Sequence, residues 1–308
     1  MALAAEKRVR DHVRITPVES SQILGDDVYL KFENHQRTGS FKVRGAFNKM
    51  LVLPEADRAR GVVAASTGNH GQAVACAARE LGTRATIFAP EHAETSKLKA
   101  IERYGASITR HGEDCVVAEV AARAFAAQEG LSYISPYNDP DVVAGQATMG
   151  VELAQQLEDI DAIFIALGGG GLLGGVGGYL KALGHPIEVV ACSPAHSCVM
   201  HDSIEAGRIL DQPSQPTLSD GTAGGVEADT ITFEICREVV DHRVLVSEEE
   251  IAAAMRLLIE EHHTMVEGAA GVALAGFLAM REQFTSRKSV VVLCGANASA
   301  DVLRRVLT

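Results

Sequence analysis

Short apolar runs alternate with stretches of helical periodicity from residue 61 onward. Residues 61–66 (GVVAAS) and 85–90 (ATIFAP) have the continuous apolar character of buried strands. Between them, residues 71–82 carry apolar side chains at helical spacing, and Gly82 is a typical helix end. A strand, a helix and a second strand in this order form a βαβ unit with parallel strands. The pattern therefore predicts an α/β protein.

The same alternation continues to the C-terminus. Further helices are expected near residues 94–104, 113–129, 141–157, 197–206, 232–240, 248–262 and 267–283. Two more are expected, one between a Gly-rich loop and residue 183 and the other after residue 295. Further strands are expected at residues 107–111, 131–136, 162–167, 187–193, 242–247 and 289–295. Two α/β sheets fit these elements better than one. Residues 208–232, rich in Pro, Gly, Ser and Thr, predict a long loop beside a site.

A lysine stands at the threshold of a predicted helix in the N-terminal part of the chain. Residues 38–40 (TGS) are typical of a turn, and a helical apolar pattern follows from Val43 to Leu51. Lys42 lies at the start of this helix, where the helix dipole disfavours a cation. A surface lysine that extends into solvent is one interpretation. The other is an amine kept in its neutral, nucleophilic form.

Composition and charge narrow the class of protein. The 308 residues are 47% hydrophobic and 22% charged, which suits a large core or two linked lobes. A net charge of −12 argues against electrostatic binding of nucleic acid or an anionic membrane, so a small-molecule partner is expected. Charged residues interrupt every long apolar run, so neither a signal peptide nor a membrane span is expected. Six cysteines without a C-x-x-C pair indicate a reduced, cytoplasmic protein.

Four consecutive glycines, Gly168–Gly171, follow a predicted strand and open a helix. Without Cβ atoms they can bring several N–H groups close to a phosphate. Gly169, Gly171 and Gly174 also satisfy the pattern G-x-G-x-x-G, so a nucleotide-binding regulatory module is an alternative. The acidic residue of that pattern should end the next strand, whereas Glu188 stands at the strand's beginning. A single phosphate therefore suits the loop better than a dinucleotide, and tight helix–sheet packing is the alternative without a ligand.

Two further loops also follow predicted strands, where open α/β sheets bind ligands. Residues 66–72 (STGNHGQ) place hydroxyl, amide and imidazole groups at the start of a helix. This assembly suits a carboxylate, and an ordinary N-cap would explain only its first two residues. Cys294 ends the strand in VVVLCGANAS, where a cysteine by itself is most often a small buried hydrophobic residue.

Five motifs occur along nearly the whole chain in the order TGSFKVRGA, STGNHGQAVA, AGQATMGVEL, GGGGLLGG and EGAAGVALA. In this combination they resemble the fold-type II pyridoxal phosphate enzymes, specifically the threonine/serine dehydratase and serine racemase family. The resemblance implies a tryptophan-synthase-β-like α/β fold, with two open twisted domains and the site between them. It implies a large cofactor-binding domain of residues 1–47 and 139–308, with a small domain of residues 48–138 inserted in it. It also suggests a homodimer.

The resemblance implies roles for individual residues as well. Lys42 would form the Schiff base with pyridoxal 5'-phosphate and then remove the substrate's Cα proton. Cys294 would face the pyridine nitrogen, and Asn69 would contact the phenolic oxygen. The other cofactor contacts would come from Phe41 beside the ring, Gly168, Gly169, Gly170, Gly171 and Leu172 at the phosphate, and Glu267 nearby. The substrate would contact Ser66, Thr67, Gly68, Asn69, His70 and Tyr137, of which Ser66 and Thr67 are also candidate catalytic residues.

The expected reaction is α,β-elimination from a β-hydroxy amino acid such as L-threonine or L-serine, giving a 2-oxo acid and ammonia. The neutral thiol of Cys294 cannot hold the pyridine nitrogen protonated as a carboxylate would, which suits elimination better than a long-lived carbanion. Serine racemases carry a serine at the position of Thr67, whose branched Cβ restricts its hydroxyl. Racemisation of serine is therefore the alternative. Specialised substrates are others: 3-hydroxyaspartate, phenylserine or an intermediate of the hydroxyectoine pathway.

Substrate choice is expected to depend on the most individual segment of the site region, residues 219–233, together with Tyr137 and Asn138. No bound metal is expected. Ser193 and Val199 stand where the racemase-like branch places carboxylates for a divalent cation, and hard cations need charged oxygen ligands.

Overall fold

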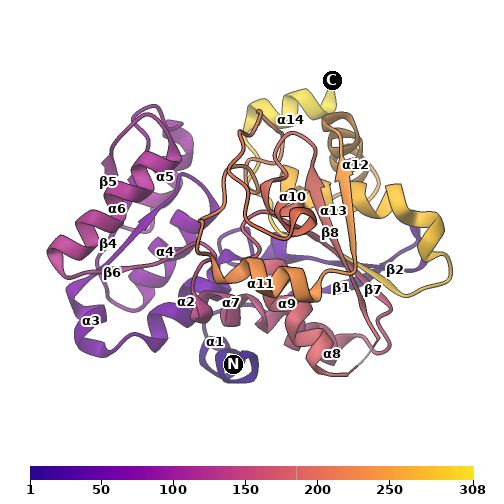
Figure 1. Ribbon diagram of the computed structural model, residues 1–308, viewed down its shortest axis with the longest axis horizontal. Coiled ribbons are helices and arrows are strands. Elements are labelled where there is room, and N and C mark those ends of the chain that lie inside the picture. The colour runs from indigo at the N-terminus through magenta and orange to yellow at the C-terminus, as the bar shows by residue number, and fades with distance from the viewer. Residues whose placement is uncertain (185) are drawn as a thin grey trace.

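The computed structural model describes residues 1–184 and 186–308. Two sheets organise this part of the chain: a six-stranded sheet of order β1-β2-β10-β7-β8-β9 and a four-stranded sheet of order β5-β4-β3-β6. Figure 1 shows them as two lobes, the smaller in purple and magenta and the larger mostly in orange and yellow. All strand pairs are parallel except β1 with β2. The predicted α/β fold with two sheets is confirmed.

The large sheet consists of β1 (Val18–Ser21), β2 (Gly25–Lys31), β7 (Ala162–Ala166), β8 (Glu188–Pro194), β9 (His242–Val246) and β10 (Ser289–Val292). The central strand β10 pairs Val291 with Leu30 on one side and with Phe164 on the other. Parallel strands buried on both faces are almost continuously apolar, and β7 and β10 are buried at every position. This burial explains why their apolar runs predicted strands correctly.

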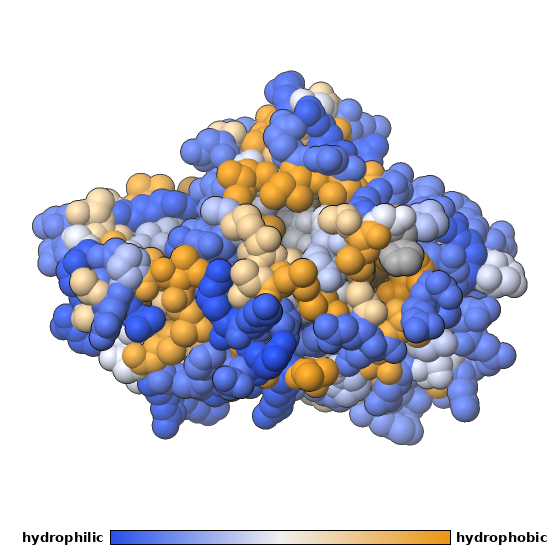
Figure 2. Space-filling view, turned by 90° about the horizontal axis from the view of Figure 1, so that it is seen from below, coloured by the Kyte–Doolittle hydropathy of each residue, from blue (hydrophilic) through white to orange (hydrophobic). Residues whose placement is uncertain are grey.

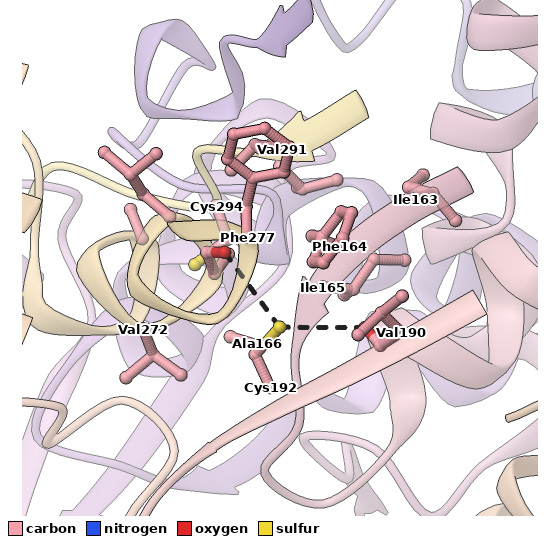
Figure 3. Packing of buried hydrophobic residues seen from close by; sticks show 14 of the residues in the cluster. Ile163, Phe164, Ile165, Ala166, Val190, Cys192, Val272, Phe277, Val291 and Cys294 are labelled. Carbon is pink, nitrogen blue, oxygen red and sulfur yellow. Dashed lines mark hydrogen bonds between the residues drawn. The ribbon is translucent and has the colours of Figure 1, made fainter. Parts of the chain in front are cut away.

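The core of the large lobe lies between this sheet and α13 (Gly268–Met280), a helix that is apolar on almost all sides. Figure 3 shows Phe277 of α13 edge-on to Phe164 of β7, with ring centroids 5.2 Å apart. The thiol of Cys192 donates to the carbonyl oxygens of Val190 and Ala273. A Cβ at Gly276 would lie 2.4 Å from Cys192 Sγ, so the glycine lets α13 approach β8 closely.

The small sheet consists of β3 (Val62–Ala65), β4 (Ala85–Ala89), β5 (Ser107–Arg110) and β6 (Ser132–Tyr133). Its helices are α3 (Glu55–Arg60), α4 (Asn69–Glu80), α5 (Thr95–Glu102) and α6 (Cys115–Glu129). Separate apolar clusters fill its two faces, one under α4 and the other under α6. The boundaries of the two domains, at residues 47/48 and 138/139, stay a prediction.

The remaining helices are α1 (Ala2–Val9), α2 (Lys42–Val52), α7 (Pro140–Gln146), α8 (Thr148–Gln156), α9 (Gly171–Ala182), α10 (Val199–Ala206), α11 (Ile231–Val239), α12 (Glu248–Glu260) and α14 (Ala300–Leu307). Short 3-10 turns lie at Glu33–His35 and Arg281–Phe284. Helix α2 packs against both α4 and α7, and Figure 1 shows α2 and α7 between the two lobes. The helix that begins at Lys42 thus lies where the lobes meet.

The structure corrects two of the predicted elements. The single helix expected at residues 141–157 is wrong, because a turn at Ala147 separates α7 from α8 and the Thr148 hydroxyl donates to the Gly145 carbonyl. The strand expected at residues 131–136 is only two residues long, since its chain turns away toward the site. Helix α1 and strands β1 and β2 had no clear periodicity to predict them.

No helix among the described residues is long and apolar enough to cross a membrane. Figure 2 shows apolar patches between hydrophilic residues on the face seen from below, the side on which α1 and α8 lie in Figure 1. Apolar residues interspersed among polar ones are ordinary for a protein surface.

Candidate active site

Lys42 is the first residue of α2, and its Nζ donates to the carbonyl oxygen of Pro136 at 2.9 Å. Its amine lies 5.2 Å from the centre of the Phe41 ring. Burial lowers the pKa of this amine to about 8, and the nearby Glu267 offsets only part of that effect. The lysine that the sequence placed at a helix start is therefore neutral far more readily than a surface lysine.

Glu267 precedes α13 and is almost completely buried. The Asn69 amide donates to both of its oxygens at 2.8 Å, the backbone N–H of Asn297 donates to Oε2 at 3.2 Å, and the Cys294 thiol lies 4.0 Å from Oε1. Burial raises the pKa of Glu267 to about 7, against the opposing effect of the Asn69 hydrogen bonds. Burial and Glu267 also hold the pKa of the Cys294 thiol well above its usual range, so Cys294 is a neutral thiol at pH 7.

Asn297 is a site residue that the sequence interpretation missed. Its Nδ2 donates to the Asn69 side-chain oxygen at 2.6 Å and to the Thr38 carbonyl at 2.9 Å. It thereby joins the start of α4, the turn before α2 and the loop after β10. Its position could have been predicted from the sequence, because Asn297 lies three residues after Cys294 in a loop that follows a strand, and such loops hold ligand-binding groups.

The glycine loop between β7 and α9 leaves no room for side chains. A Cβ at Gly169 would lie 2.4 Å from the Tyr137 ring, and one at Gly168 would lie 3.0 Å from Thr222 Cα. Gly170 has a φ of +82°, a conformation that favours glycine. Within the described part of the chain, the N–H groups of Gly168 to Gly170 have no recorded protein acceptor. The loop is therefore a cradle of backbone donors at a helix N-terminus, which fits a phosphate.

Residues 66–68 form the partly exposed turn between β3 and α4, and Asn69 and His70 are the first two residues of α4. The Ser66 hydroxyl accepts the Gly68 N–H at 3.1 Å, and nothing lies within 4 Å of the Cβ position of Gly68. His70 is different, because its ring is buried and its Nε2 donates to the Ile134 carbonyl at 2.8 Å. Burial lowers the pKa of His70 to about 3, so the imidazole is neutral. Of the predicted substrate contacts, His70 thus has one ring nitrogen already engaged.

The predicted site residues come from six separate segments, and hydrogen bonds and side-chain contacts join several of them. The Phe41 N–H donates to the Cys294 carbonyl at 3.1 Å, which joins the start of α2 to the end of β10. Pro136, the acceptor of Lys42, precedes Tyr137, whose ring lies against Gly169. Leu172 is buried in the core of the large lobe, so its backbone alone can face a ligand. The contacts bring these residues together, and their individual roles stay predictions.

An amine of lowered pKa, a neutral thiol and a backbone phosphate cradle, at strand ends where two α/β lobes meet, define the class of enzymes that bind a phosphorylated aldehyde through a lysine. The chain belongs to the family of pyridoxal-phosphate-dependent enzymes, whose family model matches residues 9–295. The resemblance inferred from the five motifs is confirmed, as is the cofactor. A phosphate rather than a dinucleotide is therefore the ligand expected at the glycine loop.

Individual relatives agree with this family. The chain is 38% identical to an L-threonine ammonia-lyase of Thermotoga maritima, over 93% of this chain and 71% of the relative. It is 37% identical to the L-threo-3-hydroxyaspartate ammonia-lyase of Saccharomyces cerevisiae, over 96% and 91% of the two chains. The structure of the processed form of threonine deaminase isoform 2 from Solanum lycopersicum superposes with a TM-score of 0.94. That match has 32% identity and covers 99% of this chain and 86% of the other.

Proposed function

We propose that the protein is a pyridoxal-phosphate-dependent ammonia-lyase that converts a small β-hydroxy amino acid, such as L-threonine or L-serine, into a 2-oxo acid and ammonia. The observation that carries this proposal is the position of Lys42 where the lobes meet: its Nζ donates to the Pro136 carbonyl at 2.9 Å, and the N–H of the adjacent Phe41 donates to the Cys294 carbonyl at 3.1 Å. The relatives from Thermotoga maritima and Saccharomyces cerevisiae, which are ammonia-lyases by name, support the same reaction class.

The residues of the site fit the cofactor. Among the described residues, the Lys42 amine donates to the Pro136 carbonyl oxygen and forms no ion pair, so no ion pair has to break before the amine reacts. The cradle of Gly168–Gly171, with the Leu172 backbone, would hold the phosphate, and Phe41 would lie beside the ring. Glu267 orients Asn69, which would contact the ring's oxygen substituent, and the Cys294 thiol would contact the ring nitrogen. When bound, pyridoxal phosphate supplies an electron sink for the bond that breaks at the substrate's Cα.

The substrate carboxylate binds in the turn of Ser66, Thr67, Gly68, Asn69 and His70. This turn is open to a ligand at Gly68, and the N-terminus of α4 favours an anion there. The hydroxyls of Ser66 and Thr67 orient that carboxylate, and the neutral His70 is held on Ile134. The substrate's Cα is thereby placed toward Lys42.

Lys42 acts as the base that removes the Cα proton. A lysine with its usual pKa of about 10.4 is neutral in only about one molecule in 2,500 at pH 7, whereas a pKa of about 8 raises this to about one in ten. Loss of the Cα proton and the β-hydroxyl removes one water, and hydrolysis of the C–N bond consumes one. The 2-oxo acid and ammonia then contain all the atoms of the substrate, and no oxidant is needed.

The segment around residues 219–233 contributes to substrate choice. Its Glu227 donates a backbone N–H to the Tyr137 hydroxyl at 3.0 Å, and its side chain accepts from Asn138 at 2.9 Å. The Ile231 N–H donates to Asn138 Oδ1 at 3.1 Å. These contacts fix the segment beside the glycine loop, where Thr222 already lies against Gly168. Residues 219–233 thus line one side of the site and lie outside the five motifs that carry the family resemblance.

A panel of β-hydroxy amino acids tests this proposal by measuring 2-oxo acid release. We expect turnover of L-threonine or L-serine by the holoenzyme and none by Lys42→Ala. If 3-hydroxyaspartate alone is turned over, the proposed substrate is wrong and the proposed elimination reaction still holds. Chiral chromatography measures D-serine in the same reaction. D-serine formed faster than pyruvate would instead support a serine racemase, the activity that Thr67 disfavours. The wild-type protein should also show a visible absorbance band that borohydride fixes covalently at Lys42.

Assembly and location follow the same family resemblance. We propose a homodimer in the cytoplasm. The six cysteines, all free in the described part of the chain, are consistent with a reducing compartment. Analytical ultracentrifugation of the purified protein measures the assembly, and a monomer at micromolar concentration would contradict it.

A further inference from the structure

The four glycines of the phosphate cradle have no side chains, and only backbone and neighbouring groups can orient their peptides. The Gly174 N–H at the start of α9 donates to the Gly170 carbonyl at 2.8 Å, and neighbouring segments add further contacts. Helix α11 provides two such contacts from adjacent turns on one face. The Thr232 hydroxyl donates to the Gly169 carbonyl at 2.7 Å, and the Cys236 thiol donates to the Gly170 carbonyl at 3.5 Å. Both side chains are completely buried.

Each of these contacts also determines where the next N–H group points. A trans peptide is planar, so the carbonyl of one residue and the N–H of the following residue point in opposite directions. A hydrogen bond that holds the Gly169 carbonyl toward α11 therefore directs the Gly170 N–H away from α11. The same reasoning applies to the Gly170 carbonyl and the Gly171 N–H. The φ of +82° at Gly170 accommodates this arrangement.

The two donors are themselves held in place. The Thr230 and Thr232 hydroxyl oxygens lie 2.8 Å apart, and the Thr230 side chain also caps the start of α11. Burial raises the pKa of the Cys236 thiol to about 12, so its S–H remains available as a donor at neutral pH. On another side of the loop, the Tyr137 ring lies against Gly169. The loop is thus supported by α11 and by Tyr137.

We propose that Thr232 and Cys236 are positioning residues for cofactor binding: they hold the Gly169 and Gly170 carbonyls toward α11 so that the Gly170 and Gly171 N–H groups face the phosphate. Neither residue belongs to the motifs that carry the family resemblance. The inference rests on the phosphate-binding role of the glycine loop in the proposed function, and it does not depend on which amino acid is the substrate.

The test compares pyridoxal phosphate with pyridoxal, which lacks the phosphate, as ligands of the apoprotein. Dissociation constants are measured by absorbance and fluorescence titration for the wild type, Thr232→Val and Thr232→Ser. Valine keeps the shape of threonine without its hydroxyl, and we expect Thr232→Val to bind pyridoxal phosphate about three- to tenfold more weakly. Its affinity for pyridoxal should equal that of the wild type. Thr232→Ser keeps the hydroxyl and should restore the affinity for pyridoxal phosphate.

Thr264→Val is the matched control, because Thr264 is another buried threonine whose hydroxyl accepts from Asn34 rather than contacting the loop. It should change neither dissociation constant. The ³¹P resonance of the bound cofactor should move in Thr232→Val and in Cys236→Ala, because both variants change the orientation of the backbone N–H groups that face the phosphate.

Equal weakening of both ligands by Thr232→Val would overturn the inference, because the effect would then not involve the phosphate. Unchanged binding of both ligands, with an unmoved ³¹P resonance, would overturn it as well. A wild-type protein that binds the two ligands equally well would refute the phosphate role of the loop itself. Failure of the proposed function has a different signature, namely tight pyridoxal phosphate binding without 2-oxo acid release.

Discussion

Arg44 offers a stringent test of how the helix that carries Lys42 is anchored. Its guanidinium contacts Glu33 through Nε and NH2 at 2.8 Å, and Glu152 through NH1 at 2.7 Å and NH2 at 2.9 Å. Lys31 completes the group with a bond of 2.9 Å to Glu152. Arg44, Lys31 and Glu33 are completely buried, and the four formal charges sum to zero. Arg44→Met removes one cation from this balanced cluster.

The magnitude follows from what the substitution leaves behind. Two buried carboxylates would share the single cation of Lys31, and loss of one partner from a buried ion pair costs about 3–5 kcal/mol. The double variant Arg44→Met with Glu33→Gln is neutral again, since Lys31 and Glu152 remain paired. We expect it to recover about 1–3 kcal/mol of the unfolding free energy, because the two positions are in direct contact.

The pH dependence of this loss has a defined sign. Burial alone would raise the pKa of Glu33, but the charge and hydrogen bonds of Arg44 hold it below its ordinary value. In the wild type, the ionised Glu33 therefore contributes stability above the unfolded pKa of about 4.3, and that contribution is lost as the pH falls. Without Arg44, burial dominates and the pKa of Glu33 rises, so the variant loses stability as the pH increases above about 4.3.

Urea unfolding of the apoproteins, followed by far-ultraviolet circular dichroism at pH 5 and pH 7.5, measures both effects. The difference in unfolding free energy between the wild type and Arg44→Met should be larger at pH 7.5 than at pH 5. A difference below about 1 kcal/mol at pH 7.5, or one that does not grow with pH, would refute the reasoning. So would a double variant no more stable than Arg44→Met.

Three further predictions concern the site and its surroundings. Gly169→Ala should weaken pyridoxal phosphate binding more than tenfold, because its Cβ would overlap the Tyr137 ring. The control is Gly178→Ala on α9, whose Cβ would have Val239 at 4.0 Å as its neighbour among the described residues. This variant should bind pyridoxal phosphate normally, and its free energy of unfolding should increase by about 0.5–1 kcal/mol. The rate at which Lys42 captures pyridoxal phosphate should rise with pH and level off above about 8, and a plateau reached only above pH 10 would contradict the lowered pKa. Arg123→Ala removes partly exposed ion pairs with Glu119 and Glu227 and a contact with the Tyr133 ring. It should cost about 1 kcal/mol of unfolding free energy, and 1 M salt should reduce that cost without abolishing it, as chemical denaturation can measure.

The sequence predicted most of the elements around the site because each depends on local pattern. The buried strands β7 and β10 are apolar runs, and four consecutive glycines after a strand are typical of a loop that binds phosphate. The break between α7 and α8 was missed because no proline or glycine marks Ala147. Asn297, Thr232 and Cys236 were given no individual role for a different reason. Asn297 lies in the loop after Cys294 and Thr232 lies in residues 219–233, but their partners are distant in sequence.

What the sequence determined by itself is the order of strands, helices and ligand loops, and hence which residue types stand at the ends of strands. What only the tertiary structure decided is the chemical state of those residues. Asn69 and Glu267 are 198 positions apart and Lys42 meets the carbonyl of a residue 94 positions away, so their environments arise from packing of the lobes. A pKa responds to burial and to charges within a few ångströms, which folding supplies, whereas periodicity records neighbours along the chain. The lysine was visible in the sequence; the lowered pKa of its amine is a property of the fold.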